Sequence, residues 1–279
     1  NQMHSTRIGA RYQQITEGGR SIHKLLKESN KTLRISAGHP EWRAYVDFVN
    51  NVVVAGLTKA VQVSLEWLGV QVDPVVIEEK EKPPMLQISI NLNNNNVSFI
   101  PSVFDEDRNG VKASLRLWIE DTLKIGTLMK RLDLGDGTYV RELQQDVVVQ
   151  GHMASIFENI GHNEEKCREF QKQYEKYAFL WTTDLQAMFQ EFIRGATSVS
   201  DTGLRRIDLV KFDEEMNRLN EIKEEVASLK TPTNIGWLKI DSTPIKENIV
   251  YWVQKWLHLY TGYLRDDVIT KLQSLRVFI

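Results

Sequence analysis

The residues that could do chemistry are few and are not clustered. The six histidines form no HxxxH or HExxH pair, the spacings that place two metal ligands on one face of a helix. His152 and His162 precede the single cysteine, Cys167, and a Cys/His nucleophile pair stays open as an alternative. Three glutamates lie within three residues of that cysteine. We therefore expect a raised thiol pKa and a structural role for Cys167.

No phosphate-binding loop or catalytic carboxylate pair is predicted. The sequence contains no Gly-Lys-Ser or Gly-Lys-Thr, which a Walker-type loop requires. The glycines at residues 135–137 are too few and follow no predicted strand. The pairs Glu214-Glu215 and Glu224-Glu225 fall opposite apolar positions, on the solvent face of a helix. We expect no catalytic, cofactor-binding or metal-binding residue in this chain.

Composition narrows the class of protein. The chain has 279 residues, of which 42% are apolar and 26% charged, with a net charge of −2. This balance favours a folded protein and excludes a strong field toward nucleic acid or an anionic membrane. One cysteine cannot form an internal disulfide, which indicates a reducing compartment. No uninterrupted apolar run approaches the roughly 20 residues of a membrane span. We expect no nucleic-acid, membrane or small-molecule partner. We also expect an excerpt from a longer chain, because the sequence starts at Asn1 and ends inside an apolar helical pattern.

The first half of the sequence predicts helices. Residues 1–39 are polar and predict one short helix. Pro40 and Glu41 favour the start of a long helix, because proline fits the first helical position and a carboxylate suits the positive end of the helix dipole. That helix is predicted to extend to Gly69. Residues 73–84 predict a charged linker.

A β-hairpin is predicted over residues 85–104. Its first strand has aliphatic residues at every second position: Leu86, Ile88, Ile90 and Leu92. The asparagines at 93–96 favour a turn, because asparagine tolerates left-handed backbone geometry. A two-stranded hairpin alone is marginally stable, so we expect it to lie on helices. With helices over 111–132 and 139–160, residues 40–160 predict one helical bundle that contains the hairpin.

Two apolar stripes characterise the predicted second bundle, residues 161–279. A helix over 163–193 carries the first stripe, which we interpret as core rather than as a cofactor slot. This stripe consists of Phe170, Tyr174, Tyr177, Trp181, Leu185, Met188 and Phe192. The second stripe has heptad-like spacing and is called the seam: Phe212, Met216, Leu219, Ile222 and Val226. Two interpretations of the seam stay open, internal packing and the docking of a partner helix.

Residues 231–243 predict a corner between two long helices. Pro232 prevents the preceding helix from continuing, and Gly236 permits a tight bend. Residues 238–240 alternate aliphatic, lysine and aliphatic, so an extended strand can bury both aliphatic side chains. We expect a buried corner plug made of Trp237, Leu238, Ile240, Trp252 and Trp256.

The helix after the corner has a predicted start. Thr243 is expected to be its N-cap, with Pro244 at the first helical position. The charge of Asp241 suits the positive end of this helix. The whole pattern predicts a mainly α fold of consecutive antiparallel helical bundles with one small β-hairpin. On composition and spacing alone, it would be a cytosolic scaffold or a stand-alone adaptor that binds partner helices.

The corner also carries a family resemblance. The sequence GWLKID at 236–241, the PIK at 244–246, Trp252 and the KW at 255–256 together resemble a segment in the tails of dynein heavy chains. Upstream, the sequences YAFLW at 177–181 and FQEF at 189–192 look like the helix before that segment in axonemal dyneins, and the hairpin is similar to the strand pair before it. The sequence of residues 240–246 is most similar to that of outer-arm axonemal heavy chains. The resemblance covers about residues 40–279.

The resemblance implies a mechanical part of a motor. In that family the elongated tail is a series of helical bundles that joins heavy chains, carries intermediate and light chains, and transmits force to the axonemal microtubule. ATP hydrolysis in the family belongs to distant AAA modules, so the resemblance transfers no catalytic residue or cofactor to this chain. The implied location is the cytoplasm and cytoskeleton, in the axoneme of a cilium or flagellum.

Overall fold

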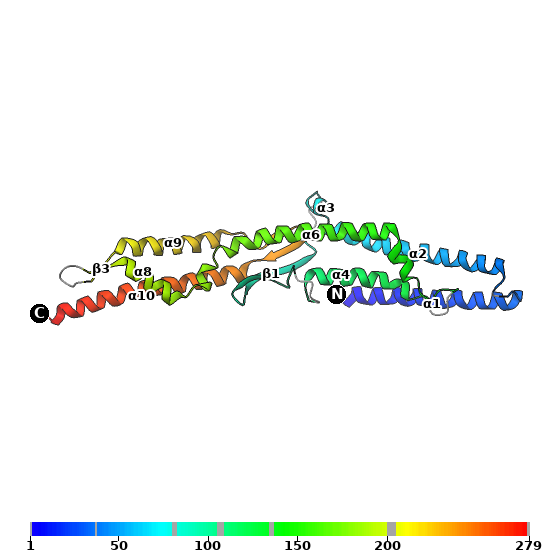
Figure 1. The fold of residues 1–279 in the computed structure, drawn as a ribbon, viewed down its shortest axis with the longest axis horizontal. Helices are drawn as coiled ribbons and strands as arrows, with labels where there is room; N and C mark the ends of the chain where they lie inside the picture. Colours follow the sequence, from blue (N-terminus) through cyan, green and yellow to red (C-terminus); the bar gives the residue numbers. More distant parts are fainter. Residues whose placement is uncertain are drawn as a thin grey trace. The chain divides into compact units, whose positions relative to one another are not determined.

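The computed structural model describes residues 2–36, 38–79, 83–104, 109–133, 137–199 and 205–277. The chain forms two compact units. Unit 1 comprises Asn1–Pro83 and Phe104–Asn163, and unit 2 comprises Pro84–Val103 and Glu164–Ile279. Helices dominate the fold, with a small sheet among them, which confirms the predicted mainly α class (Figure 1).

Unit 1 is built from helices. Its elements are α1 (Gln2–Leu33), α2 (Pro40–Val72), α3 (Pro74–Glu79), α4 (Val111–Leu123), the 3₁₀ helix η1 (Lys124–Thr127), α5 (Val140–Gln145) and the first part of α6 (Val147–Glu175). The start of α2 at Pro40 confirms the prediction for this helix. Val61, Leu65 and Leu68 on α2 are buried and form part of the core of this unit.

Helix α2 is more apolar overall than the lengths of its uninterrupted apolar runs suggest. Among the described residues, α2 is the one helix long and apolar enough, by length and composition, to cross a membrane. The most apolar window of α2 is 28% buried inside the protein. A single such helix is weak evidence of a membrane span, and α2 also contributes buried residues to the core of unit 1.

Three sequence predictions in unit 1 were wrong. The N-terminal segment forms the 32-residue helix α1 rather than a short helix. The predicted linker contains α3, because the Asp73 side chain accepts hydrogen bonds from the backbone N–H groups of Val75 and Val76 and so starts a helix. The predicted helix over 139–160 is two helices, α5 and α6. They separate at Asp146, whose side chain accepts from the Val149 N–H, and α6 continues through Gly161.

The helix predicted over 111–132 also ends early. The α-helical part stops at Leu123, and one turn of 3₁₀ helix follows. Gly126 in that turn lies against the backbone of Val140, so the chain here is set by a close contact rather than by periodicity. Residues 134–136 of the predicted loop after this helix lie outside the described residues.

Unit 2 combines helices with all the assigned strands of the described chain. Its elements after the end of α6 are α7 (Phe179–Thr182), α8 (Leu185–Ala196), β3 (Thr197–Val199), β4 (Arg205–Ile207), α9 (Leu209–Ser228), β5 (Thr233–Ile235), β6 (Leu238–Asp241) and α10 (Thr243–Val277). The hairpin strands are β1 (Leu86–Asn93) and β2 (Asn96–Ile100). The long helices α9 and α10 pack side by side (Figure 1).

The predicted hairpin forms, and it joins a larger sheet. Asn94 and Asn95 have φ values of 48° and 64°, so the asparagine turn takes the expected left-handed geometry. The sheet has the order β2-β1-β6-β5, and β1 pairs with β6 in parallel, with Leu86 opposite Leu238. The hairpin therefore belongs to unit 2, and its predicted place in the bundle of residues 40–160 was wrong.

The helix predicted over 163–193 is broken into the end of α6, α7 and α8. The break occurs at Asp184, whose side chain accepts hydrogen bonds from the N–H groups of Gln186 and Ala187 and caps α8. The break changes the helical phase, so Phe189 is buried while Met188 of the predicted stripe is exposed. Residues 200–204 of the predicted loop over 195–203 lie outside the described residues.

Candidate functional site

The corner between α9 and α10 is the site that the sequence singled out. Strands β5 and β6 pair with Ile235 opposite Leu238, which leaves a two-residue turn, Gly236-Trp237. Gly236 has a φ of 52°, in the left-handed region that glycine adopts without strain from a Cβ atom. The predicted tight bend is therefore present, and it is the turn of a second hairpin.

Trp237 is buried in this turn. Its side chain is 2% exposed. The Trp237 carbonyl accepts hydrogen bonds from the N–H groups of Met85, at 2.8 Å, and Leu86, at 3.3 Å, and these bonds connect the turn to the start of β1. Leu238 and Ile240 are fully buried and Lys239 is half-buried, as the strand alternation predicted. The corner thus has a closed apolar centre.

Polar groups of the corner fix the start of α10. The Thr243 N–H donates to Asp241 Oδ1 at 2.9 Å, and the Ser242 N–H donates to Thr231 Oγ1 at 3.1 Å. The Lys246 N–H donates to the Ser242 carbonyl, so Ser242 precedes the first helical residue. Thr243 is then the first residue of α10 and not its N-cap, because Asp241 already supplies the capping oxygen. The hydrogen bond from the Thr243 backbone lowers the pKa of Asp241.

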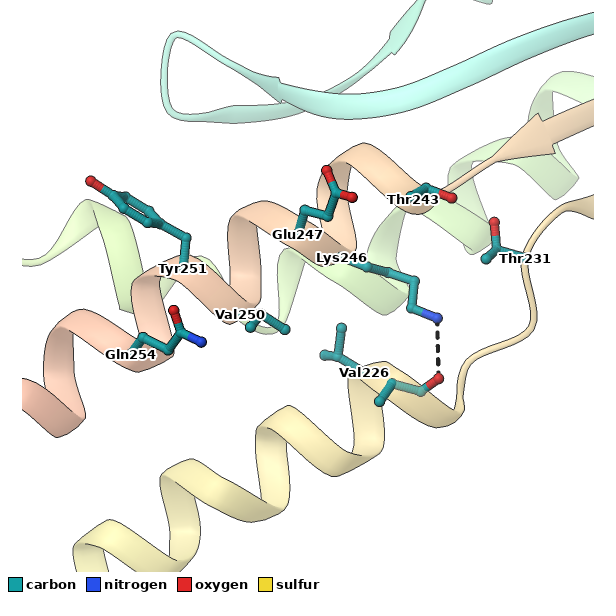
Figure 2. Close-up of a pocket in the computed structure, with 9 residues that line it drawn as sticks. Val226, Thr231, Thr243, Lys246, Glu247, Val250, Tyr251 and Gln254 are labelled. Carbon is teal, nitrogen blue, oxygen red and sulfur yellow. Dashed lines mark hydrogen bonds between the residues drawn. The ribbon is translucent and has the colours of Figure 1, made fainter.

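Lys246 connects α10 to the end of α9. Its Nζ donates to the carbonyl oxygen of Leu229 at 2.7 Å and to that of Ala227 at 3.2 Å, and Figure 2 draws the second bond as a dashed line. A positive charge at the C-terminal end of a helix is favourable, because the unpaired carbonyls there carry partial negative charge. A pocket of about 330 Å³ lies beside this contact, with Val226 and Val250 among the residues that line it. This pocket offers apolar side chains and an engaged lysine, an arrangement suited to holding two helices together.

The two remaining tryptophans of the predicted corner plug differ. Trp256 is buried, and its Nε1–H donates to the Leu180 carbonyl at 3.0 Å. Trp252 is half-buried, and Lys255 Nζ lies 4.6 Å from the centre of its ring. Trp252 therefore does not belong to the buried plug. The buried stripe of α10 consists instead of Ile245, Ile249, Val253, Trp256 and Tyr260.

The seam packs inside the chain. Phe212, Leu219 and Val226 are buried, whereas Met216 and Ile222 are half-buried. The Phe212 ring stacks on Tyr263 of α10, with centroids 5.9 Å apart. Because α9 packs against α10, the three buried positions favour internal packing of the seam over the docking of a partner helix.

The possible nucleophile is closed to substrate. Cys167 is fully buried, and burial, followed by the charge of Glu164, raises the pKa of its thiol to about 12. The thiol is therefore protonated at neutral pH. His162 is exposed, with Nε2 3.9 Å from Glu158, and His152 is half-buried. Within the described residues, no group of three or more His, Cys, Asp or Glu side chains could hold a metal ion.

Sequence reasoning missed two contacts that hold the hairpin in unit 2. Asn248 on α10 donates from Nδ2 to Asn91 Oδ1 at 2.9 Å, and Trp181 Nε1–H donates to the Asn95 carbonyl at 3.0 Å. No local sequence pattern predicts these two hydrogen bonds, because the residues that they join lie far apart in the sequence.

Comparison with known proteins identifies relatives along the whole chain. The chain is 33% identical over 273 residues to the dynein beta chain of the flagellar outer arm of Chlamydomonas reinhardtii, which covers 97% of this chain and 6% of that protein. It is 24% identical over 287 residues to the ciliary dynein beta chain of Heliocidaris crassispina, covering 98% of this chain. It is 23% identical over 282 residues to dynein axonemal heavy chain 17 of Mus musculus, covering 97% of this chain. The chain spans about 6% of the length of each of these relatives. No family model matches it.

Proposed function

Because this chain is homologous over 97% of its length to axonemal dynein heavy chains, we propose that it is a stem segment of such a heavy chain, with a mechanical and assembly role. The observation that carries the proposal is this homology, which includes the corner and both long helices that meet there. The location that the names of the relatives indicate is the axoneme of a cilium or flagellum. The stand-alone adaptor is not favoured, since its docking seam is largely buried.

The corner supports the mechanical part of the proposal. Trp237, Leu238 and Ile240 are buried in the strands that connect α9 to α10, and Lys246 binds the carbonyls at the end of α9. A dense apolar contact resists separation of the helices, because pulling them apart exposes the buried surface to water. In the proposed role this segment transmits load between the motor and its attachment on the microtubule. ATP hydrolysis belongs to other modules of the parent chain, and this segment has no cofactor.

The assembly part of the proposal concerns partners. The proposed partners are other dynein heavy chains, intermediate chains and light chains. Crosslinking mass spectrometry of the intact outer-arm complex tests this directly. Exposed lysines such as Lys59 and Lys223 are expected to crosslink to neighbouring chains. If crosslinks from residues 40–279 reach only the same heavy chain in the intact complex, the assembly role is contradicted.

A mechanical measurement tests the stem role. The 279-residue chain, held by its two ends, is expected to unfold at a clearly lower force when Trp237 is replaced by alanine. The matched control is Trp252→Ala, which removes a half-buried ring of the same size from α10. Equal unfolding forces for the wild type and Trp237→Ala would show that the corner does not bear load.

A further inference from the structure

A large groove lies in unit 1, far from the corner in the sequence and separate from it. It has a volume of about 850 Å³ and is lined by residues of α1, α2, α4 and η1. This volume is comparable with the roughly 300–1,000 Å³ of pockets that enclose a drug-sized ligand. The seam is covered by α10, but within the described residues no element fills this groove.

The small residues of α2 that line the groove, together called its floor, allow close approach. Gly56, Ala60 and Ser64 recur every four residues on one face of α2 and line the groove. A Cβ atom built on Gly56 would meet nothing within 4 Å, so the surface there is open. Such small side chains let the backbone of a second helix come near, at the short end of the usual interaxial distances.

Larger apolar side chains also line the groove. Val63 lines the groove and is 52% exposed. Trp118 on α4 also lines the groove, and its ring centroid lies 6.1 Å from that of Trp67, which is 53% exposed. Exposed aromatic side chains next to a hollow are typical anchor points of helix-in-groove recognition.

The charged residues that line the groove, together called its rim, are mostly cationic. Arg11, Lys59 and Lys124 line it, against one carboxylate among the lining residues, that of Asp121. Lys124 Nζ is bonded to Asp121 Oδ1 at 2.7 Å, so this pair is already neutralised. Within the described residues, Arg11 and Lys59 have no carboxylate within 4 Å. The rim thus presents two cations to whatever enters the groove.

We propose that the groove binds an amphipathic helix of a partner chain, with acidic residues flanking its apolar face. The apolar face fills the floor along Gly56 and Ala60, and the carboxylates meet Arg11 and Lys59. Charge complementarity selects an acidic helix over a basic one and speeds its association. This inference rests on the proposed function, because it assigns one surface on which a partner chain of the assembly docks.

A binding measurement on the full 279-residue chain tests the proposal. The probe is a labelled helical peptide of Glu, Ala and Leu with all leucines on one face, and its match has Lys at every Glu position. Fluorescence anisotropy is expected to give binding of the Glu peptide about tenfold or more tighter than that of the Lys peptide, a difference of about 1.4 kcal/mol. Binding of the Glu peptide is expected to weaken as salt is added.

Two variants locate the binding. Gly56→Leu places a side chain in the groove and is expected to weaken binding about tenfold or more, whereas Gly56→Ala leaves most of the volume open and is the matched control. Lys59→Glu reverses a rim charge and is also expected to weaken binding. Its match is Lys223→Glu, the same change on the exposed side of α9, which is expected to have no effect. Circular dichroism checks that each variant is folded.

Three outcomes would overturn the proposal: no binding of the Glu peptide, equal binding of the Lys peptide, or unchanged binding by both Gly56→Leu and Lys59→Glu. The peptide-binding test and the crosslinking test of the proposed function can fail independently of each other. If the intact complex crosslinks to neighbouring chains but the Glu peptide does not bind, the groove proposal fails and the assembly role stands. If the peptide binds as expected but no neighbour crosslinks, the assembly role fails.

Discussion

The corner of unit 2 and the groove of unit 1 are both places where helices meet, and they are filled differently. At the corner, Trp237 lies in the turn between β5 and β6 and is 2% exposed. In the groove, Gly56 and Ala60 leave a hollow of about 850 Å³, and Val63 at its edge is 52% exposed. Large apolar side chains close a junction and hold it, because they are buried against each other. Small side chains at a junction leave apolar surface for another chain.

The largest effect is expected at the centre of the corner. Trp237→Ala removes a fully buried indole and should lower the free energy of unfolding by about 3–5 kcal/mol, through lost burial and the cavity that remains. Urea unfolding followed by circular dichroism measures this. Trp252→Ala is the matched control and should cost about 1 kcal/mol, because that ring is half-buried.

The loss measured for Trp237→Ala shows whether Trp237 lies in a packed junction or at the surface. A loss below about 1 kcal/mol for Trp237→Ala would mark the residue as peripheral and remove the contrast with the groove. The indole Nε1–H of Trp237 is buried without a hydrogen-bond partner among the described residues. Trp237→Phe should therefore be milder than the alanine variant, since it keeps an aromatic ring and removes that donor.

The seam gives the next largest effect. Leu219 is 1% exposed between α9 and α10. Leu219→Ala should lower the free energy of unfolding by about 2–5 kcal/mol. Ile222→Ala, on the same helix but half-buried, should cost clearly less. Similar small losses for both variants, with normal folding, would restore the interpretation of the seam as a docking surface.

Alanine substitutions at two glycines, Gly126 and Gly56, test whether the space beside each glycine in unit 1 is occupied. A Cβ atom on Gly126 would lie 2.8 Å from the backbone nitrogen of Val140, so Gly126→Ala should cost about 1–3 kcal/mol. Gly56→Ala meets open space and should stabilise α2 by about 0.5–1 kcal/mol, because alanine favours the helix. Thermal unfolding of the two variants should shift in opposite directions. A destabilised Gly56→Ala would mean that the groove floor is not open.

The sequence predicted local features better than distant contacts. The bend at Gly236 and the alternation of residues 238–240 follow from backbone chirality and the strand period, and both were confirmed. The parallel pairing of Leu86 with Leu238 joins strands far apart in the chain, and no local pattern encodes such a pairing. The break at Asp184 was missed because apolar residues continue at helical spacing on both sides of it.

The groove shows a different limit of sequence reasoning. Gly56 and Ala60 read as ordinary positions of a helix, and a hollow arises from what neighbouring elements fail to fill. Periodicity records the positions of large apolar side chains, and on α10 it located Trp256 but none of the other buried residues of the stripe. It misassigned Trp252 because spacing alone does not fix which side of a helix is covered.

The smallest expected effect is electrostatic and lies at the start of α10. The pKa of Asp241 is lowered in the folded chain, chiefly by the hydrogen bond from the Thr243 backbone. A carboxyl group with a depressed folded pKa contributes stability above its unfolded pKa and loses it as the pH falls through the folded value. Asp241→Asn keeps a capping oxygen but does not titrate. At neutral pH the wild type should exceed this variant by about 0.3–1 kcal/mol, the usual value of a charge at a helix N-terminus.

That difference should be constant near neutral pH and should shrink from about pH 4 downward, because the unfolded chain takes up the Asp241 proton first. Urea unfolding of both proteins at several pH values measures it, and other titrating groups cancel between the two. A difference that stays unchanged at low pH would show that the charge of Asp241 does not support the helix. The corner would then depend on its buried side chains and on the hydrogen bonds of Lys246, and the charge of Asp241 would not contribute to its stability.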